Sequence, residues 1–396
     1  MLSLLSEKVQ QFIHQHANDD ERELVLKYKA IEGVPLARIA EQIAGRRKAK
    51  DKLPTFYSTP DILYPRGINL EQSSSEQTAK FKTEVVKGAL TSHSTVVDLT
   101  GGFGIDVYFF SKIFNKVEYI EPDELLVQIV QHNHRQLGAV NISHHHTIAE
   151  NFLQTSWKAD LVFIDPSRRT RGQKVFKLSD CEPDVTALYN LIFEKTEYLL
   201  IKTSPLLDIQ QALRELPTVQ KVYVVSVANE CKELLFLCKK TVLHEPEIIT
   251  VNILSAHTQE FSFTKTQEQH IIVAYSSPLE YLYEPNASLL KAGAFKVVTS
   301  RYGLFKIDVS THLYTSTLYK EDFPGRVFRV EALIKNDPKI IQTYFPEGKA
   351  NVMTRNYPLT VEELKKKTKL KDGGEKFLIG FSGSKGKFLA VAKRVV

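Results

Sequence analysis

The stretch Val96–Asp106, which reads Val-Val-Asp-Leu-Thr-Gly-Gly-Phe-Gly-Ile-Asp, constrains the fold more than any other part of the chain. Its apolar start predicts a short strand, and Gly102-Phe103-Gly104 predicts a tight turn into a helix over 107–113. Because glycine has no Cβ, the backbone here can turn sharply and approach a ligand closely. Such a turn also occurs for packing alone, so by itself it leaves both interpretations open.

A second predicted strand, over 117–121, ends in Glu121, which follows Asp98 by 23 residues. In a βαβ unit, an acidic residue about 20 residues beyond the glycine turn can accept hydrogen bonds from ribose hydroxyls. The turn lacks the third glycine of the pattern that seats a pyrophosphate, and Asp106 brings negative charge to the start of the helix. Both features favour a cationic ligand without phosphate, S-adenosylmethionine, over a dinucleotide.

A third predicted strand, over 160–164, runs into Asp165-Pro166-Ser167-Arg168-Arg169 at the sheet edge where ligands bind in open α/β folds. In this order, Asp98-x-x-x-Gly102-x-Gly104, Glu121 and Asp165-Pro166 resemble a class I S-adenosylmethionine-dependent methyltransferase. Ser74–Phe81 is similar to the segment ahead of the sheet in the RNA cap guanine-N2 methyltransferase branch. The whole chain resembles a small bacterial family that joins such a domain to a THUMP-like C-terminal region.

This resemblance implies a set of cofactor-binding residues. The strand end and the turn would hold the methionine part through Asp98, Thr100, Gly102, Phe103, Gly104 and Asp106. Glu121 would hold the ribose, and Glu150, which follows the next predicted strand, would bind the adenine amino group.

The resemblance also assigns the acceptor edge to Asp165, Pro166 and Arg168. Amino-methyltransferases with an Asp/Asn-Pro-Pro-aromatic motif hold the target amine with the acidic or amide side chain and a backbone carbonyl, and stack the aromatic ring on the base. This chain has Ser167 for the second proline and Arg168 for the aromatic residue. Arg168 could still stack on a base or bind a phosphate. The structural alternative is an Asp–Arg ion pair that only caps the sheet edge.

Alternating strand and helix patterns predict a mainly parallel sheet. We place its strands at 95–99, 117–121, 143–148, 160–164, 197–203, 220–226 and 233–239. The last two leave room for only a short connection, so they should be antiparallel, as the reversed seventh strand of the resembled family requires. The expected fold class is α/β: a seven-stranded Rossmann-like methyltransferase sheet with an N-terminal helical domain and a C-terminal α+β, THUMP-like region.

A chain of 396 residues is long enough for several cores. Changes in composition along it predict four parts: an N-terminal helical domain and linker (1–70), the S-adenosylmethionine-binding methyltransferase domain (71–244), a small β-rich domain (245–330) and a basic THUMP-like domain (331–396).

The net charge of +6 is localised at the C-terminus, because residues 361–396 hold ten Lys and Arg against four Asp and Glu, and the rest of the chain balances. Thr360-Val361-Glu362-Glu363 predicts a capping box that opens a lysine-rich helix. A localised basic patch is what a nucleic acid recognises, although a solvated lysine-rich face is the alternative. We predict substrate or RNA contacts for Arg169, Lys202, Lys365, Lys366, Lys367 and Lys385.

Other features limit the possible functions. No apolar run reaches the roughly 18–20 residues of a membrane span, and the N-terminus does not read as a signal peptide. The adjacent His144, His145 and His146 would alternate between the two faces of a strand, so we predict no metal site.

We therefore expect a cytoplasmic enzyme that uses S-adenosylmethionine to methylate a base in tRNA or rRNA. The alternatives are a non-catalytic S-adenosylmethionine-binding module that binds RNA, and a methyltransferase acting on DNA or protein. The sequence leaves the acceptor atom and the oligomeric state open.

Overall fold

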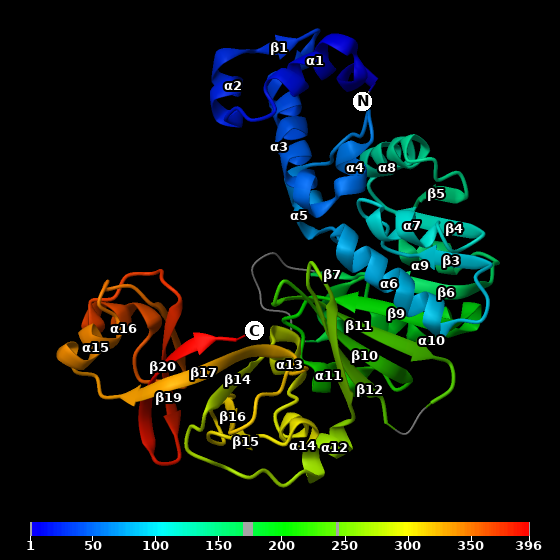
Figure 1. Cartoon of the computed structure of the whole chain (residues 1–396). Coiled ribbons are helices and arrows are strands. Elements are labelled where there is room, and N and C mark those ends of the chain that lie inside the picture. The colour runs from blue at the N-terminus through cyan, green and yellow to red at the C-terminus, as the bar shows by residue number, and fades with distance from the viewer. Residues whose placement is uncertain (1, 169–176, 243–244, 396) are drawn as a thin grey trace. The chain divides into compact units, whose positions relative to one another are not determined.

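The structure is a computed structural model that describes residues 2–168, 177–242 and 245–395 (Figure 1). Its residues fall into two units. The first comprises Met1–Gln220 with Leu235–Leu243, and the second comprises Lys221–Leu234 with His244–Val396. The predicted division into four parts stays a prediction.

The first unit begins with short helices whose ends follow local capping rules. Ser6 and Asp20 accept backbone N–H groups at the starts of the second and third of these helices. The elements are η1 (Leu2–Leu5), α1 (Glu7–Gln15), α2 (Glu21–Lys27), β1 (Ala30–Ile31), β2 (Val34–Pro35), α3 (Leu36–Lys52), α4 (Pro54–Ser58) and α5 (Gly67–Gln72).

Two buried carboxamides fasten the segment between α4 and α5. Asn133 accepts from the N–H of Leu63 and donates to its carbonyl, at 2.9 and 2.7 Å. Gln42 does the same for Tyr64, at 2.8 Å for both bonds. The backbone of this segment is thereby satisfied although it is buried.

The main sheet has nine strands in the order β13-β12-β10-β11-β9-β6-β3-β4-β5. Its inner strands are apolar on both faces, as in sheets that helices cover on both sides. The strands are β3 (Thr95–Asp98), β4 (Lys116–Glu121), β5 (Ile142–His146), β6 (Ala159–Ile164), β9 (Thr196–Thr203), β10 (Val219–Val227), β11 (Glu230–Lys239), β12 (Glu247–Ile253) and β13 (Thr258–Phe263).

Among the described residues, one helix leads into the first strand of this sheet, and five more connect its parallel strands. They are α6 (Glu76–Ala89), α7 (Ile105–Phe110), α8 (Glu124–Gln136), α9 (Ala149–Leu153), α10 (Val185–Lys195) and α11 (Ile209–Glu215). A short ribbon of β7 (Ser167–Arg168) and β8 (Cys181–Glu182), with η2 (Leu178–Asp180), lies in the connection after β6.

The predicted α/β fold is confirmed, and each of the seven predicted strands has a counterpart. The last two, β10 and β11, are neighbours joined by Ala228 and Asn229, which both have positive φ angles, of 49° and 65°. Such a two-residue turn makes an antiparallel hairpin. The sheet is larger than predicted, because β12 pairs parallel with β10 and β13 pairs with β12.

The second unit adds a seven-stranded sheet in the order β15-β16-β14-β17-β20-β19-β18. Its elements are α12 (Lys265–His270), β14 (Tyr281–Pro285), α13 (Ala287–Ala292), α14 (Val297–Tyr302), β15 (Phe305–Lys306), β16 (Tyr314–Ser316), β17 (Gly325–Ile334), α15 (Pro338–Tyr344), β18 (Asn351–Arg355), α16 (Val361–Thr368), β19 (Lys376–Gly383) and β20 (Gly386–Arg394).

Alternate residues of β19 and β20 belong to two separate hydrophobic cores. Ile379 and Ala390 belong to one core, and Leu378 and Leu389, together with Leu364 of α16, belong to the other. The capping box predicted for α16 is present, with Thr360 and Glu363 bonding each other's backbone N–H. Within the described part of the chain, no helix is both long and apolar enough to cross a bilayer.

Candidate active site

The glycine turn joins β3 to α7, and its two predicted glycines serve different purposes. Both have left-handed φ angles, 51° at Gly102 and 71° at Gly104. A Cβ on Gly104 would lie 2.6 Å from Cγ1 of Val130 and 2.8 Å from Nε2 of His134, so α8 packs directly on this position. The nearest atom to a Cβ on Gly102 is the Thr100 carbonyl oxygen, at 3.7 Å. Gly104 therefore serves packing, and Gly102 has open space beside its backbone.

The end of β4 holds the turn in place. Glu121 Oε2 accepts the N–H of Gly102 and Oε1 accepts the N–H of Asp123, each at 3.0 Å. The hydroxyl of Tyr119 donates to the Gly102 carbonyl at 2.7 Å. Burial raises the pKa of Glu121. Each carboxylate oxygen can accept more than one hydrogen bond, so Glu121 retains capacity for ribose hydroxyls.

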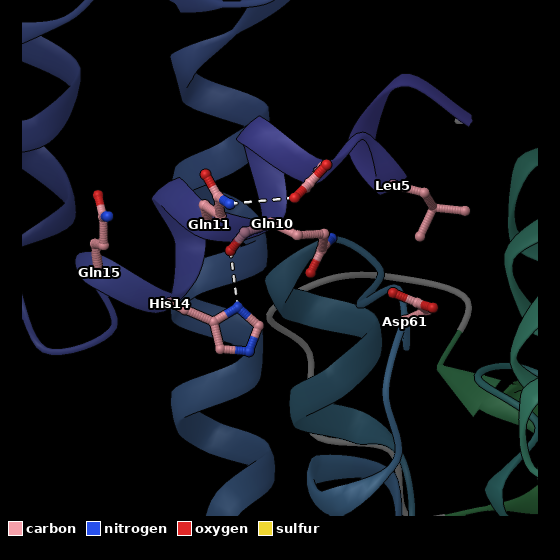
Figure 2. A pocket seen from close by; sticks show the side chains of 7 residues that line it. Leu5, Gln10, Gln11, His14, Gln15 and Asp61 are labelled. Carbon is pink, nitrogen blue, oxygen red and sulfur yellow. Dashed lines mark hydrogen bonds between the residues drawn. The ribbon is translucent and has the colours of Figure 1, made fainter.

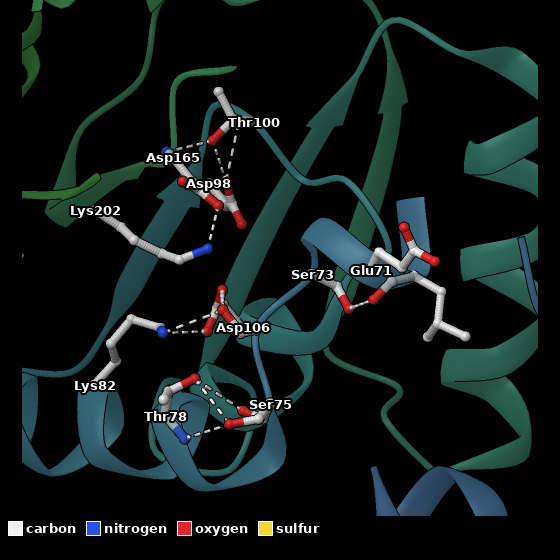
Figure 3. A network of polar contacts seen from close by, with 12 residues as sticks. Glu71, Ser73, Ser75, Thr78, Lys82, Asp98, Thr100, Asp106, Asp165 and Lys202 are labelled. Atoms are coloured by element: carbon white, nitrogen blue, oxygen red, sulfur yellow. Dashed lines mark hydrogen bonds and ion pairs between the residues drawn. The ribbon is translucent and has the colours of Figure 1, made fainter. Parts of the chain in front are cut away.

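Asp98 and Asp165 end neighbouring strands and are linked through Thr100 (Figure 3). The N–H of Thr100 donates to Asp98 Oδ1 at 2.9 Å, and the N–H of Asp165 donates to Thr100 Oγ1 at 2.7 Å. Asp98 is 1% exposed. Its burial raises its pKa well above the usual range, and the nearby charges of Asp106 and Asp165 act in the same direction.

Two buried lysines face the carboxylates of this region (Figure 3). Lys202 on β9 donates to Asp165 Oδ2. Lys82 on α6 lies 3.2 Å from Asp106 Oδ1 and donates to Ser74 Oγ at 3.1 Å. The Ser74 hydroxyl in turn donates to Asp106 Oδ2 at 2.6 Å. Asp106 is therefore held from two sides at the start of α7.

Among the residues that the structure describes around the turn, four carboxyl groups lie near two ammonium groups. The carboxyl groups are those of Asp98, Asp106, Glu121 and Asp165, and the ammonium groups are those of Lys82 and Lys202. Even with Asp98 protonated, as its raised pKa favours, the other three carboxyl groups outnumber the two ammonium groups, which favours a cationic ligand and disfavours a pyrophosphate.

The remaining predicted cofactor residues lie in two different environments. Phe103 is 3% exposed, and its ring packs against Phe56 and Tyr64, with centroids 5.8 and 6.5 Å away. A ligand contact by Phe103 would therefore come from its backbone. Glu150 is exposed in the first turn of α9, directly after β5. Its predicted contact with adenine stays a prediction.

At the acceptor edge, Asp165 is half-buried and Pro166 is buried. Ser167 and Arg168 form β7, in register with Glu182 and Cys181 of β8. The side chain of Arg168 and the whole of Arg169 lie outside the described residues. Among the described side chains, Lys202 pairs with the carboxylate of Asp165.

Lys202 is 8% exposed, so its ammonium can act on a substrate mainly through Asp165. Lys82, which is 0% exposed, is a site residue that the sequence analysis missed. The sequence around Lys82 could have indicated this role. The buried stripe of α6 is formed by Ala79, Lys82, Thr83 and Val86, and a lysine at a buried position needs an acidic partner.

The three adjacent histidines have separate protein partners. His144 Nε2 bonds His134 Nδ1 at 2.9 Å, and His134 Nε2 donates to the Gly104 carbonyl at 2.9 Å. His145 bonds Glu118, and His146 bonds the Pro122 carbonyl. Burial lowers the pKa of His134 to about 3 and that of His144 to about 4, so both are neutral. Over 2–168, 177–242 and 245–395, no three His, Cys, Asp or Glu side chains converge as metal ligands.

The predicted RNA-binding lysines of the second unit differ in exposure. Lys365 is 17% exposed and pairs with Glu362 at 3.0 Å and Asp372 at 2.8 Å. Lys366, Lys367 and Lys385 are exposed on α16 and in the β19–β20 turn.

A cavity of about 500 Å³ lies among the N-terminal helices (Figure 2). It is lined by Leu5, Glu7, Gln10, Gln11, His14, Gln15 and Asp61. None of the predicted site residues lines it.

A crystal structure of a "putative methyltransferase" from Porphyromonas gingivalis W83 is 30% identical to this chain, with a TM-score of 0.86. The match covers 98% of this chain and 98% of that one. The chain belongs to the same family. Residues 281–324 match a ferredoxin-like domain family, and residues 325–394 match the THUMP domain-like family, which confirms the predicted THUMP-like C-terminal region.

Two other solved structures illustrate how far the likeness extends. An rRNA methylase from Streptococcus thermophilus is 19% identical over 42% of this chain and 95% of that one, with a TM-score of 0.30. A SAM-dependent O-methyltransferase from Thermotoga maritima is 14% identical over 44% and 69%, with a TM-score of 0.33. At such scores neither bears on function. No curated protein matches the chain. None of these names is an RNA cap guanine-N2 methyltransferase, so that likeness stays a prediction.

Proposed function

We propose that this protein is an S-adenosylmethionine-dependent methyltransferase that modifies a base in RNA. The observation that carries the proposal is the excess of carboxyl groups around a glycine turn that has open space at Gly102. A sulfonium cation without phosphate suits this setting better than a nucleotide.

The residues around the turn match the parts of the cofactor. The methionine part would be held by Thr100, Gly102, Gly104, Asp106 and the backbone of Phe103, beside Asp98; Glu121 would bind the ribose, and Glu150 the adenine. When bound, S-adenosylmethionine supplies a methyl group activated by the sulfonium. The protein then has mainly to exclude water and align the acceptor, because in-line transfer depends chiefly on positioning.

Asp165 is the proposed orienting acceptor for an N–H group of the substrate base. Its Oδ2 is engaged by Lys202, which helps to orient the carboxylate, and a carboxylate has further lone pairs that can accept a substrate N–H. Pro166 and Arg168 would border the same base.

The second unit supports RNA as the substrate. It contains the THUMP domain-like segment and the exposed Lys366, Lys367 and Lys385. Arg169, Lys202 and Lys365 complete the proposed set of contacts, with Lys202 acting through Asp165. DNA or protein as the acceptor is the alternative.

The test is transfer of tritiated methyl from S-adenosylmethionine into size-fractionated RNA from cells that lack this protein. We expect label in one RNA class, loss of label in Asp165→Ala, and loss of cofactor binding in Glu121→Ala by calorimetry. Wild-type protein that takes up no S-adenosylmethionine would refute the cofactor assignment. Label in DNA or protein and none in RNA would refute the substrate.

A second candidate is a non-catalytic module that binds S-adenosylmethionine and RNA. The replacement of the usual proline and aromatic residue by Ser167 and Arg168 favours it. Cofactor and RNA binding without methyl transfer to any RNA class would support this candidate over the enzyme.

A further inference from the structure

A buried carboxylate in the second unit holds two arginines. The side chain of Glu284 on β14 is 4% exposed. Nε of Arg326 donates to its Oε2, and Nε of Arg355 donates to its Oε1, both at 2.6 Å. The Nη2 groups of the two arginines contact the same oxygens. Each guanidinium is thus gripped side-on by one carboxylate oxygen.

These three residues come from strands that are not all neighbours. Glu284 lies opposite Arg326 in the register of β14 and β17. Arg355 lies on β18, at the far edge of the seven-stranded sheet, yet it reaches the same carboxylate. On each of the three strands, the residue two positions from the charged one belongs to one shared core cluster. These residues are Leu282, Phe328 and Met353. The three charged groups therefore close one end of that core on the same face of the sheet.

One arginine would suffice to neutralise Glu284. With two, the group keeps a net charge of +1, although the arginine side chains are only 31% and 38% exposed. A guanidinium has five N–H donors. Arg326 uses its Nε and Nη2 groups on Glu284, and Arg355 also donates from Nη1 to the Thr354 carbonyl. Each arginine retains further N–H groups for an acceptor from outside.

The shared carboxylate also fixes the orientation of both guanidinium planes. An arginine whose rotamer is already fixed loses less side-chain entropy when it binds an anion. A phosphate group presents the oxygens that match two guanidinium forks.

We propose that Arg326 and Arg355 form a binding site for a backbone phosphate of the RNA substrate, with Glu284 as the residue that orients them. This inference rests on the proposed function. It places an RNA contact where the ferredoxin-like segment, which contributes Glu284, meets the THUMP-like segment, which contributes both arginines.

The experiment measures binding of the full-length protein to the RNA class that it methylates, by fluorescence anisotropy over a range of salt concentrations. Arg326→Gln is compared with Arg329→Gln. Arg329 lies on the same strand, is 64% exposed and pairs with Glu280 at 3.4 Å, so both variants remove one positive charge from β17. We expect Arg326→Gln to weaken binding about tenfold and to lower the slope of log K against log[salt] by about one. Arg329→Gln should change the affinity less than about twofold.

A third variant separates ligand binding from stability. Arg326→Lys keeps the charge beside Glu284 but cannot form the fork, so we expect a lower melting temperature than wild type and a loss of part of the RNA affinity at temperatures where melting curves show the variant folded. S-adenosylmethionine affinity should be unchanged in all three variants. Equal RNA binding by Arg326→Gln and Arg329→Gln would overturn the site while leaving the proposed function standing. Wild-type protein that neither binds nor methylates RNA would overturn both.

Discussion

The glycine turn offers a test that separates folding from ligand binding, through alanine substitutions two residues apart. Both glycines have positive φ, so an L-alanine at either costs about 1–2 kcal/mol in backbone strain. At Gly104 the added Cβ also meets Val130 and His134 at 2.6 and 2.8 Å, and overpacking of this kind costs about 1–3 kcal/mol more. We therefore expect Gly104→Ala to lower the free energy of unfolding by about 2–5 kcal/mol.

Gly102→Ala should behave differently, because its Cβ would have no neighbour closer than 3.7 Å. The strain alone lowers the free energy of unfolding by about 1–2 kcal/mol. If S-adenosylmethionine lies over this backbone, the new methyl group occupies its space, and the affinity should fall at least about tenfold, or roughly 1.4 kcal/mol.

Denaturant unfolding and titration calorimetry on the two variants test this reasoning. Gly102→Ala that binds S-adenosylmethionine as tightly as wild type would show that the ligand does not lie over the turn. Gly104→Ala that is as stable as Gly102→Ala would show that the contact with α8 does not limit this position.

Two further predictions concern the groups around the turn. Lys202→Met should lower kcat for methyl transfer by about ten- to a hundredfold, because Asp165 loses the group that orients it, while Lys202→Arg should retain most of the rate. Initial rates at saturating cofactor measure this effect, and an unchanged kcat in Lys202→Met would contradict it. Burial lowers the pKa of His134 from 6.5 to about 3, so the unfolded chain binds a proton there that the folded chain does not. The free energy of unfolding should therefore fall by about 1.4 kcal/mol per pH unit as pH drops from about 6.5 towards 3, less steeply in His134→Gln, as urea titrations at several pH values can show.

Much of the fold could be predicted because its signals are local. The apolar run Leu161–Ile164, followed by Asp165-Pro166, predicts a buried strand, and the Thr360–Glu363 pair predicts the start of α16. The pairing of β12 with β10 carried no such signal. A strand pattern says which faces are apolar, but it does not say which strand lies alongside.

The candidate site also has a part that local sequence patterns predicted and a part that they did not. The sequence by itself determined the glycine turn, Glu121 at the end of the next strand and Asp165-Pro166 at the sheet edge, because strand order brings the carboxyl ends of parallel strands together. Only the tertiary structure decided which charges meet. Lys82 reaches Asp106 from α6, Lys202 reaches Asp165 from β9, and α8 requires a glycine at position 104. These contacts join residues that lie far apart in the chain, and their geometry follows from the packing of helices and strands, which no local pattern encodes.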